Sequence, residues 1–356
     1  MKTTPLKNKI WLGLAFGLVC GTSFRRLFLK YFSPWIPPSL IIAFAFLFLL
    51  IGLVLPYIWH AREKKGTIDS YRLKATLEYL LIYALALDLS MFGWHKIEGL
   101  QMIVPLGLLD TPFSEFSGES LVWAFFKYSY PFTVFIALLQ LATGVLLLFS
   151  RTRLLAFILA VPMLVFISLL DFFYQMPIGV LIHGMILLMG VCYLLSQDFY
   201  RFKTFILQPI QGLSVLPNVN FFKWVARLSL LAWPLLFYCI YDYPDKHPQL
   251  TGKYSVQHLT VNNNHQEAIS PKDSVLTKVY LDLDDEVVFD FNDYRYRYIG
   301  QYTLDEQTDS IQIKWRYPSD SVAPFIGKLF QEKGQLVLQG KIGEDRLKMI
   351  LAKQVP

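Results

Sequence analysis

Several ionisable and amide side chains lie inside long apolar stretches of this sequence. Asp88, His95 and Lys96 belong to one such stretch, and His183 belongs to another. Charge in lipid is costly, so residues of these types normally face the interior of a helix bundle or a water-filled cavity. There they could exchange protons or hold the polar head group of a quinone or a lipid. The candidate residues for an intramembrane polar pocket are Asp88, His95, Lys96, Gln140, Asp171, Gln175 and His183.

The depths predicted for these side chains agree with one another. At about 1.5 Å per residue, Asp88 lies roughly two thirds of the way across the membrane from Ala75. His183 lies roughly 7 Å below the same outer boundary. We therefore expect a pocket in the outer half of the bilayer. In the alternative interpretation each residue has a local role: Lys96 reaches the interface, Asp171 caps a helix, and His183 bonds a carbonyl group.

The spacing of these residues does not predict a metal site. No HxxxH or ExxH pattern is present, and Cys20, Cys192 and Cys239 stand alone in apolar stretches. Cysteines in such positions usually behave as small hydrophobic residues. No quinone, haem or nucleotide motif stands out either, so no cofactor is evident from these residues.

Membrane-spanning helices are the elements that must position these residues. The chain is 54% hydrophobic and only 17% charged, and a spanning helix needs about 20 mostly apolar residues. The first candidate is the weakest, because Arg25 and Arg26 shorten its apolar part, and a re-entrant or interfacial helix is the alternative. The seven predicted spans are Ile10–Phe28, Ser39–Trp59, Ala75–His95, Phe132–Phe149, Leu154–Phe173, Ile178–Leu195 and Phe222–Tyr241.

Basic residues are concentrated in alternate loops. The segments Arg62–Lys74, Arg151–Arg153 and Arg201–Arg227 are rich in Lys and Arg, which is typical of cytoplasmic loops. This pattern predicts a cytoplasmic N-terminus and, with seven spans, a C-terminal domain on the other side of the membrane. It also accounts for much of the net charge of +6, so we expect no nucleic-acid partner.

Beyond Pro244 the sequence changes to short alternating segments that indicate β-strands. Turn residues such as Asn292-Asp293 and Lys333-Gly334 separate them. About eight short strands predict a small antiparallel barrel or sandwich, and we favour a lipocalin-sized barrel with a filled or ligand-sized interior. The predicted strands are Lys253–Val261, Leu276–Leu283, Glu286–Phe291, Arg295–Leu304, Ser310–Tyr317, Phe325–Phe330, Gln335–Ile342 and Arg346–Ala352.

Spans three to six carry a series of motifs in a recognisable order. Gly93-Trp94-His95-Lys96 ends the third span, and Ser117–Tyr130 follows in the outer loop. Phe135–Arg153 joins a span to an Arg-Thr turn, and Phe173–His183 joins an aromatic-polar-x-Pro segment to a histidine. Together with Tyr71-Arg72, these stretches resemble the DoxX family, specifically its longer members in bacteria of Bacteroidota type.

The resemblance implies a four-helix membrane module in the bacterial inner membrane, and relatives are associated with quinone-linked thiosulfate oxidation. This chain departs from the family pattern at three positions. It has Gln140 where the family has an acidic residue, Gln175 where it has Asp, and Gly179 where it has Lys. Loss of these charges favours a scaffold over an enzyme.

The sequence thus predicts a multi-pass helical membrane bundle with a C-terminal β domain. We divide it into a two-helix segment (1–70), a DoxX-like module (71–205), a cytoplasmic loop with the seventh span (206–243) and a periplasmic β domain (244–356). The preferred function is a non-enzymatic scaffold or a lipid- or quinone-binding module, whose β domain binds an envelope protein or a lipophilic ligand. The alternatives are a quinone-linked redox subunit and a transporter or channel.

Overall fold

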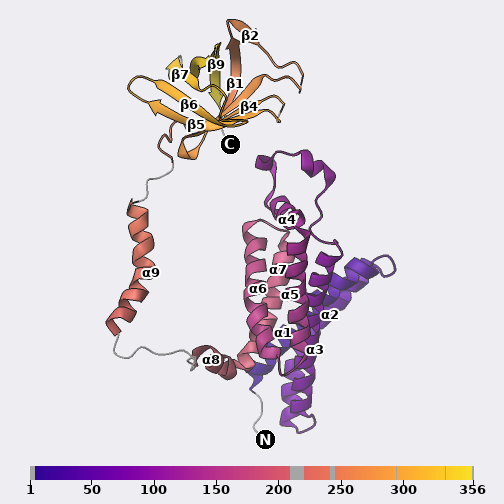
Figure 1. The fold of residues 1–356 in the computed structure, drawn as a ribbon. Helices are drawn as coiled ribbons and strands as arrows, with labels where there is room; N and C mark the ends of the chain where they lie inside the picture. Colours follow the sequence, from indigo (N-terminus) through magenta and orange to yellow (C-terminus); the bar gives the residue numbers. More distant parts are fainter. Residues whose placement is uncertain are drawn as a thin grey trace. The chain divides into compact units, whose positions relative to one another are not determined.

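The computed structural model describes residues 5–208, 220–240, 245–270, 272–293, 295–332 and 334–354. The chain divides into two compact units, Met1–Leu213 and Ser214–Pro356. The first unit is helical, and the second contains the β-sheet (Figure 1). Each unit is described by itself below.

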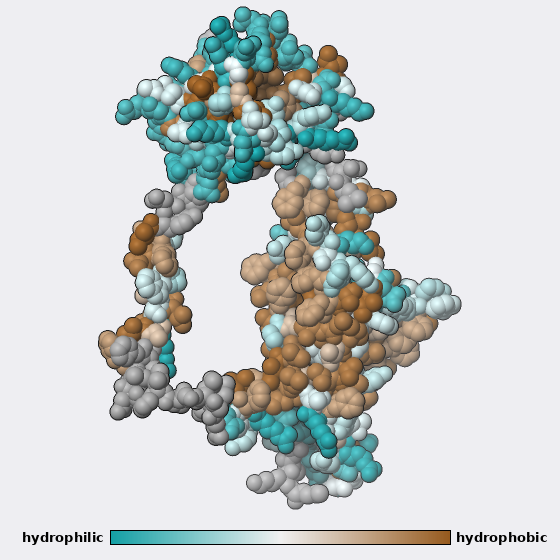
Figure 2. All heavy atoms as spheres, in the orientation of Figure 1, coloured by the Kyte–Doolittle hydropathy of each residue, from teal (hydrophilic) through white to brown (hydrophobic). Residues whose placement is uncertain are grey.

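Six helices of the first unit are long and apolar enough to cross a membrane. Hydrophobic side chains cover much of the face of this unit seen in Figure 2, as expected for helices that face lipid. Helix α1 packs against α2, α3 and α7, while α3 packs against α5, and α6 against α5 and α7. The six helices are α1 (Leu6–Phe32), α2 (Pro38–Lys64), α3 (Ser70–Ile97), α5 (Tyr130–Leu148), α6 (Arg153–Phe173) and α7 (Ile178–Gln197).

The first predicted span forms one continuous helix rather than a short interfacial one. Helix α1 has 27 residues and runs through Arg25 and Arg26 without a break. The apolar side chains of Leu12, Val19 and their neighbours are buried in the core of the unit. The two arginines therefore do not end the helix, and the environment of Arg26 described below gives the reason.

The seventh predicted span, Phe222–Tyr241, falls outside the set of six. It forms α9 (Asn220–Ile240), but the apolar part of this helix, Trp224–Ile240, is shorter than that of the other spans. Lys223 and Arg227 occupy its first turns, and charged residues there shorten the segment that lipid can accommodate. Tyr241 lies outside the described residues.

Glycines allow α1 and α2 to approach closely. Gly13 and Gly17 on α1 face Gly52 on α2, and a Cβ atom added to Gly17 would lie 2.9 Å from the carbonyl oxygen of Phe48. Small residues spaced four apart are typical of such contacts between membrane helices. This packing of α1 against α2 holds α1 in the bundle, and with it the polar residues near its C-terminal end.

Short elements complete the first unit. The loop after α3 contains the 3-10 helices η1 (Leu106–Asp110) and η2 (Phe113–Glu115), followed by α4 (Gly118–Tyr128). The Ser117 side chain caps α4 by accepting a hydrogen bond from the backbone N–H of Ser120 at 3.1 Å. Helix α8 (Phe199–Leu207) follows α7.

The β domain is a closed antiparallel barrel. Neighbouring strands pair in sequence order from β3 to β9, and β1 pairs with both β3 and β9. Strand β2 extends β1 as a short hairpin, which the sequence did not predict. The strands are β1 (Gly252–Val261), β2 (Asn264–Gln266), β3 (Leu276–Leu281), β4 (Glu286–Phe291), β5 (Arg297–Asp305), β6 (Ser310–Tyr317), β7 (Phe325–Glu332), β8 (Gln335–Ile342) and β9 (Asp345–Lys353), with η3 (Leu283–Asp285) before β4.

The interior of the barrel is a packed hydrophobic core. Leu259, Leu329, Leu338 and Met349 form one inward layer across four neighbouring strands. The ring of Phe289 lies 5.0 Å from that of Trp315 and 6.2 Å from that of Phe325. An eight-stranded barrel either encloses its own side chains or holds one small ligand, and in this barrel the buried side chains form one contiguous core.

Candidate functional site

Asp88 is the centre of a polar cluster inside the helical unit. Its side chain is completely buried, at 0% exposure. On α1, Ser23 Oγ donates a hydrogen bond to Asp88 Oδ2 at 2.5 Å, and Arg26 Nη2 donates to Oδ1 at 2.5 Å. On α7, His183 Nε2 lies 2.9 Å from Asp88 Oδ2 but is not aligned for a hydrogen bond. One carboxylate on α3 thus holds polar groups of two other helices.

The aromatic ring of Phe92 lies close to the cations of the cluster. The guanidinium carbon of Arg26 lies 3.6 Å from the centre of the Phe92 ring, and Lys96 Nζ lies 5.5 Å from it. The ring of His183 is 5.9 Å away. Cation–π contacts strengthen where water is excluded, so this ring and Asp88 together explain why α1 tolerates Arg26 in an apolar helix.

Lys96 and His95 extend the cluster towards the end of α3. Lys96 Nζ donates to Gln140 Oε1 of α5 at 3.0 Å and to Gln101 Oε1 at 3.3 Å. His95 Nε2 is hydrogen-bonded to the hydroxyl group of Tyr31 on α1. The two neighbouring residues therefore join α3 to α5 and to α1 respectively.

Asp171 and Ser168 of α6 contribute buried polar atoms that have no hydrogen-bond partner among the described residues. Ser168 Oγ, Asp171 Oδ2 and His183 Nδ1 are buried and find no hydrogen-bond partner among the described residues. A Cβ atom added to Gly184 of α7 would lie 3.3 Å from Ser168 Oγ and 3.7 Å from Asp171 Oδ2. The absent side chain of Gly184 leaves space beside these two oxygen atoms.

The structure thus brings six of the seven predicted residues into the buried interior of one unit. Gln175 is the exception: it is exposed in the turn between α6 and α7, with a backbone φ of 53°. The six buried residues are Asp88, Gln140, His95, His183, Asp171 and Lys96, with exposures from 0% to 8%.

The side chains form a buried network of contacts, and the outward-opening pocket stays a prediction. Arg26 and Lys96 provide two positive charges, and Asp88 and Asp171 two negative ones, so the formal charge is zero with neutral histidines. Buried charges persist in low dielectric only when they are paired and hydrogen-bonded. The network can hold helices together, and its unsatisfied atoms on α6 and α7 can exchange protons or accept a hydrogen bond.

The residues that α1 contributes to the network were missed from the sequence. Ser23, Arg26 and Tyr31 all come from α1, in which the sequence indicates the arginines only as an interruption of the apolar stretch. A signal was available: an arginine in one apolar stretch and an aspartate in another, both predicted at the outer end of the membrane, favour an ion pair.

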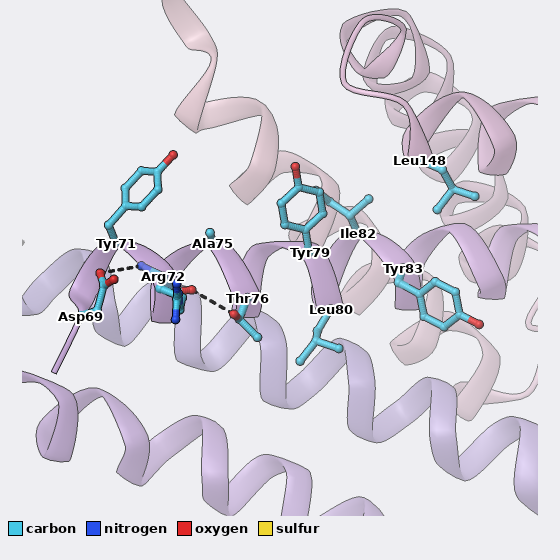
Figure 3. Close-up of a pocket in the computed structure, with 10 residues that line it drawn as sticks. All are labelled: Asp69, Tyr71, Arg72, Ala75, Thr76, Tyr79, Leu80, Ile82, Tyr83 and Leu148. Carbon is cyan, nitrogen blue, oxygen red and sulfur yellow. Dashed lines mark hydrogen bonds between the residues drawn. The ribbon is translucent and has the colours of Figure 1, made fainter.

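An open groove of the helical unit lies at the other end of α3. It has a volume of about 710 Å³ and follows the first half of the helix, with Tyr71, Tyr79 and Tyr83 along it and Leu148 of α5 beside it (Figure 3). Thr76 in this groove is 12 residues from Asp88, about 18 Å along the helix axis. Tyrosines are enriched where membrane meets water, and the groove contains none of the residues of the polar network.

A second groove, of about 730 Å³, crosses the outer face of β7, β8, β9 and β1. Four exposed basic residues from three strands line it. Ile326, 59% exposed, lies among them. The cations of this groove are Lys328, Lys341, Arg346 and Lys348.

Comparison of the chain with protein-family models, with curated proteins and with solved structures finds no match. The likeness to the DoxX family therefore stays a prediction from the motifs, and the function has to be argued from the two units themselves.

Proposed function

We propose that this chain is a multi-pass protein of the bacterial inner membrane that displays its β-barrel in the periplasm as a binding module for an anionic partner. The helical unit is the anchor and scaffold. Its polar network joins α1, α3, α5 and α7 through side-chain contacts. The observation that carries the proposal is the groove on the barrel with its four exposed cations.

The orientation that we propose rests on the positions of the basic residues. Arg62 and Lys64 lie in the last turn of α2, and Arg72 lies in the first turn of α3. Arg151 lies between α5 and α6, and Arg153 is the first residue of α6. An even number of crossings separates these two loops, so one topology places both in the cytoplasm. The N-terminus is then cytoplasmic as well.

Export of the barrel requires α9 to cross the membrane. Its apolar part, Trp224–Ile240, is about 26 Å long, at the lower end of the range of about 17–25 residues that a spanning helix uses. Periplasmic labelling of single cysteines introduced at Gln301 of the barrel and at Lys65 of the α2–α3 turn tests this in intact cells. We expect a membrane-impermeant maleimide to label the first and not the second, and the opposite result would refute the topology.

The binding role is tested by purifying the full-length chain from its native membrane. Native mass spectrometry of this material should detect a lipid or protein that is lost when Lys328 and Lys341 are both changed to Glu. Material with no bound molecule, or with the same bound molecules in both forms, would contradict a binding function for the barrel. Lys314→Glu, on β6 outside the groove, is the matched control.

A quinone-linked redox subunit is the second candidate, and the unsatisfied atoms on α6 and α7 favour it. A quinone oxygen could accept a hydrogen bond from His183 Nδ1, and the Asp171 carboxyl group could exchange a proton nearby. Membranes carrying the protein should then reduce a quinone in a substrate-dependent manner, and His183→Ala should abolish this. An unchanged rate in the variant would eliminate this role of His183.

A further inference from the structure

The basic groove of the barrel has a pattern that indicates its ligand. In the strand register, Lys328, Gln339 and Lys348 form one outward row across β7, β8 and β9. Ile326, Lys341 and Arg346 form the next row. Two adjacent rows therefore present four cations and one exposed apolar side chain on a single face.

The charges of this face differ from those of the rest of the barrel. None of the described residues that line the groove is acidic, and the nearest ion pair, Lys348 with Glu332, is long at 3.9 Å. In residues 244–356 as a whole, however, carboxylates outnumber Lys and Arg. Many of these carboxylates lie in the turns around Asp284 and Glu306. The domain thus has a polarised surface, and such a surface orients itself in an electrostatic field.

The covalent position of the barrel places this face within reach of a membrane. Strand β1 begins at Gly252, 12 residues after Ile240 ends α9, and a chain of that length spans at most about 40 Å. The six apolar helices hold the same chain in the bilayer. A tethered site meets lipid head groups at a high effective concentration, so that weak individual contacts suffice.

We propose that the groove docks the barrel onto the phosphate-bearing head groups of anionic phospholipids in the membrane that anchors the chain. The four cations pair with phosphate oxygens, and Ile326 enters the boundary between head groups and acyl chains, as apolar residues on basic interfacial surfaces do. Each Lys or Arg near an anionic surface contributes about fivefold to such binding. The proposal rests on the proposed function, because it identifies the anionic partner of the barrel.

The test uses the full chain, with Cys20, Cys192 and Cys239 changed to Ser and an environment-sensitive fluorophore on Gln339→Cys, an exposed position in the groove. One copy per nanodisc is prepared in zwitterionic lipid alone or mixed with phosphatidylglycerol, each with a spin-labelled lipid as quencher. We expect quenching only with the anionic lipid. Raising the salt to about 1 M, where the Debye length falls to about 3 Å, should remove it.

Charge reversal provides the decisive comparison. Lys328→Glu changes the local charge by two, so the ratio of docked to free barrel should fall about 25-fold. Lys314→Glu makes the same change on β6 and should have little effect. A fluorophore on Gln301→Cys, an exposed position of β5, should not be quenched in any lipid, and far-ultraviolet circular dichroism confirms that each variant keeps its strands.

Three results would overturn the proposal. Equal quenching in both lipids would show that anionic head groups are not recognised, and absence of quenching in both would show that the groove does not meet the membrane. A change that appears only in discs with two copies would assign the groove to self-association. None of these results removes a binding role of the barrel, which the native mass spectrometry tests separately.

Discussion

Replacing Asp88 with alanine should destabilise the helical unit more than any other single loss of a carboxylate there. The change leaves the Arg26 guanidinium group in the interior without its 2.5 Å partner and removes the acceptor of Ser23 Oγ and the neighbour of His183 Nε2. Removing one member of a buried ion pair costs about 3–5 kcal/mol. The Arg26 side chain is 21% exposed and can partly reach the interface, so we expect about 3 kcal/mol, the lower end of that range.

The matched control is Glu78→Ala on the same helix. Glu78 pairs with Lys74 at 3.5 Å, one turn away, and both side chains are partly exposed. Pairs of this kind contribute about 0.3–0.5 kcal/mol. Reversible unfolding in mixed micelles with increasing SDS, followed by circular dichroism, measures both losses on one scale.

A double substitution separates pairing from packing. Arg26→Met with Asp88→Leu removes both charges and keeps apolar volume, and such replacements of buried pairs are often neutral. We therefore expect the double variant to recover most of the stability lost in Asp88→Ala. Equal losses for Asp88→Ala and Glu78→Ala would refute the view that the network holds the helices together.

Three further predictions concern packing and pH. Gly17→Val should lower the unfolding midpoint of the helical unit in the same assay, because the new Cβ would meet the Phe48 carbonyl oxygen. Gly179→Val, which has open space around it, should leave the midpoint unchanged, and equal midpoints for the two variants would contradict the close α1–α2 contact. Phe289→Ala should lower the free energy of unfolding of the barrel in urea by about 3–5 kcal/mol, whereas Ile326→Ala, at an exposed position, should lower it by less than about 0.5 kcal/mol. A small decrease for Phe289→Ala would mean that the core is loosely packed. Burial, with smaller effects from Asp285 and Asp245, raises the pKa of Tyr302 to about 12, so the folded barrel keeps a proton that the unfolded chain releases above about pH 10. The thermal stability of the barrel should therefore fall as the pH rises beyond about 10, and Tyr302→Phe should reduce this fall.

The sequence by itself determined which parts of this chain meet lipid and which meet water. Runs of about 20 apolar residues can satisfy their backbone groups in lipid only as helices, so the positions of the six long helices follow from hydropathy alone. The strands of the barrel follow in the same way from short-range alternation and turn residues, and all eight predicted strands correspond to strands of the closed sheet. These signals are local, and each depends on neighbours within a few residues.

Tertiary structure decided which polar residues meet. Arg26 and Asp88 are separated by 62 positions in the chain, and no local pattern shows that α1 packs beside α3 and α7. Because of this contact, Arg26, which was expected to interrupt a span, pairs with the buried carboxylate of Asp88. The same applies to Gln175, whose depth was predicted from spacing but whose side chain is exposed because it lies in a turn.

In the barrel, too, some features follow from residues that are neighbours in the sequence, and others require the tertiary structure. Alternation predicted which of its residues point inward, but whether the interior would be filled depended on the sizes of side chains from several strands meeting in one layer. The groove likewise required the register of β7, β8 and β9, because Lys328, Lys341 and Arg346 become neighbours only when three strands are aligned. The sequence thus indicates which residues are buried and how polar and apolar residues alternate. The ion pairs and the basic face depend on contacts between distant segments, and only the closed sheet and the packed helices establish those contacts.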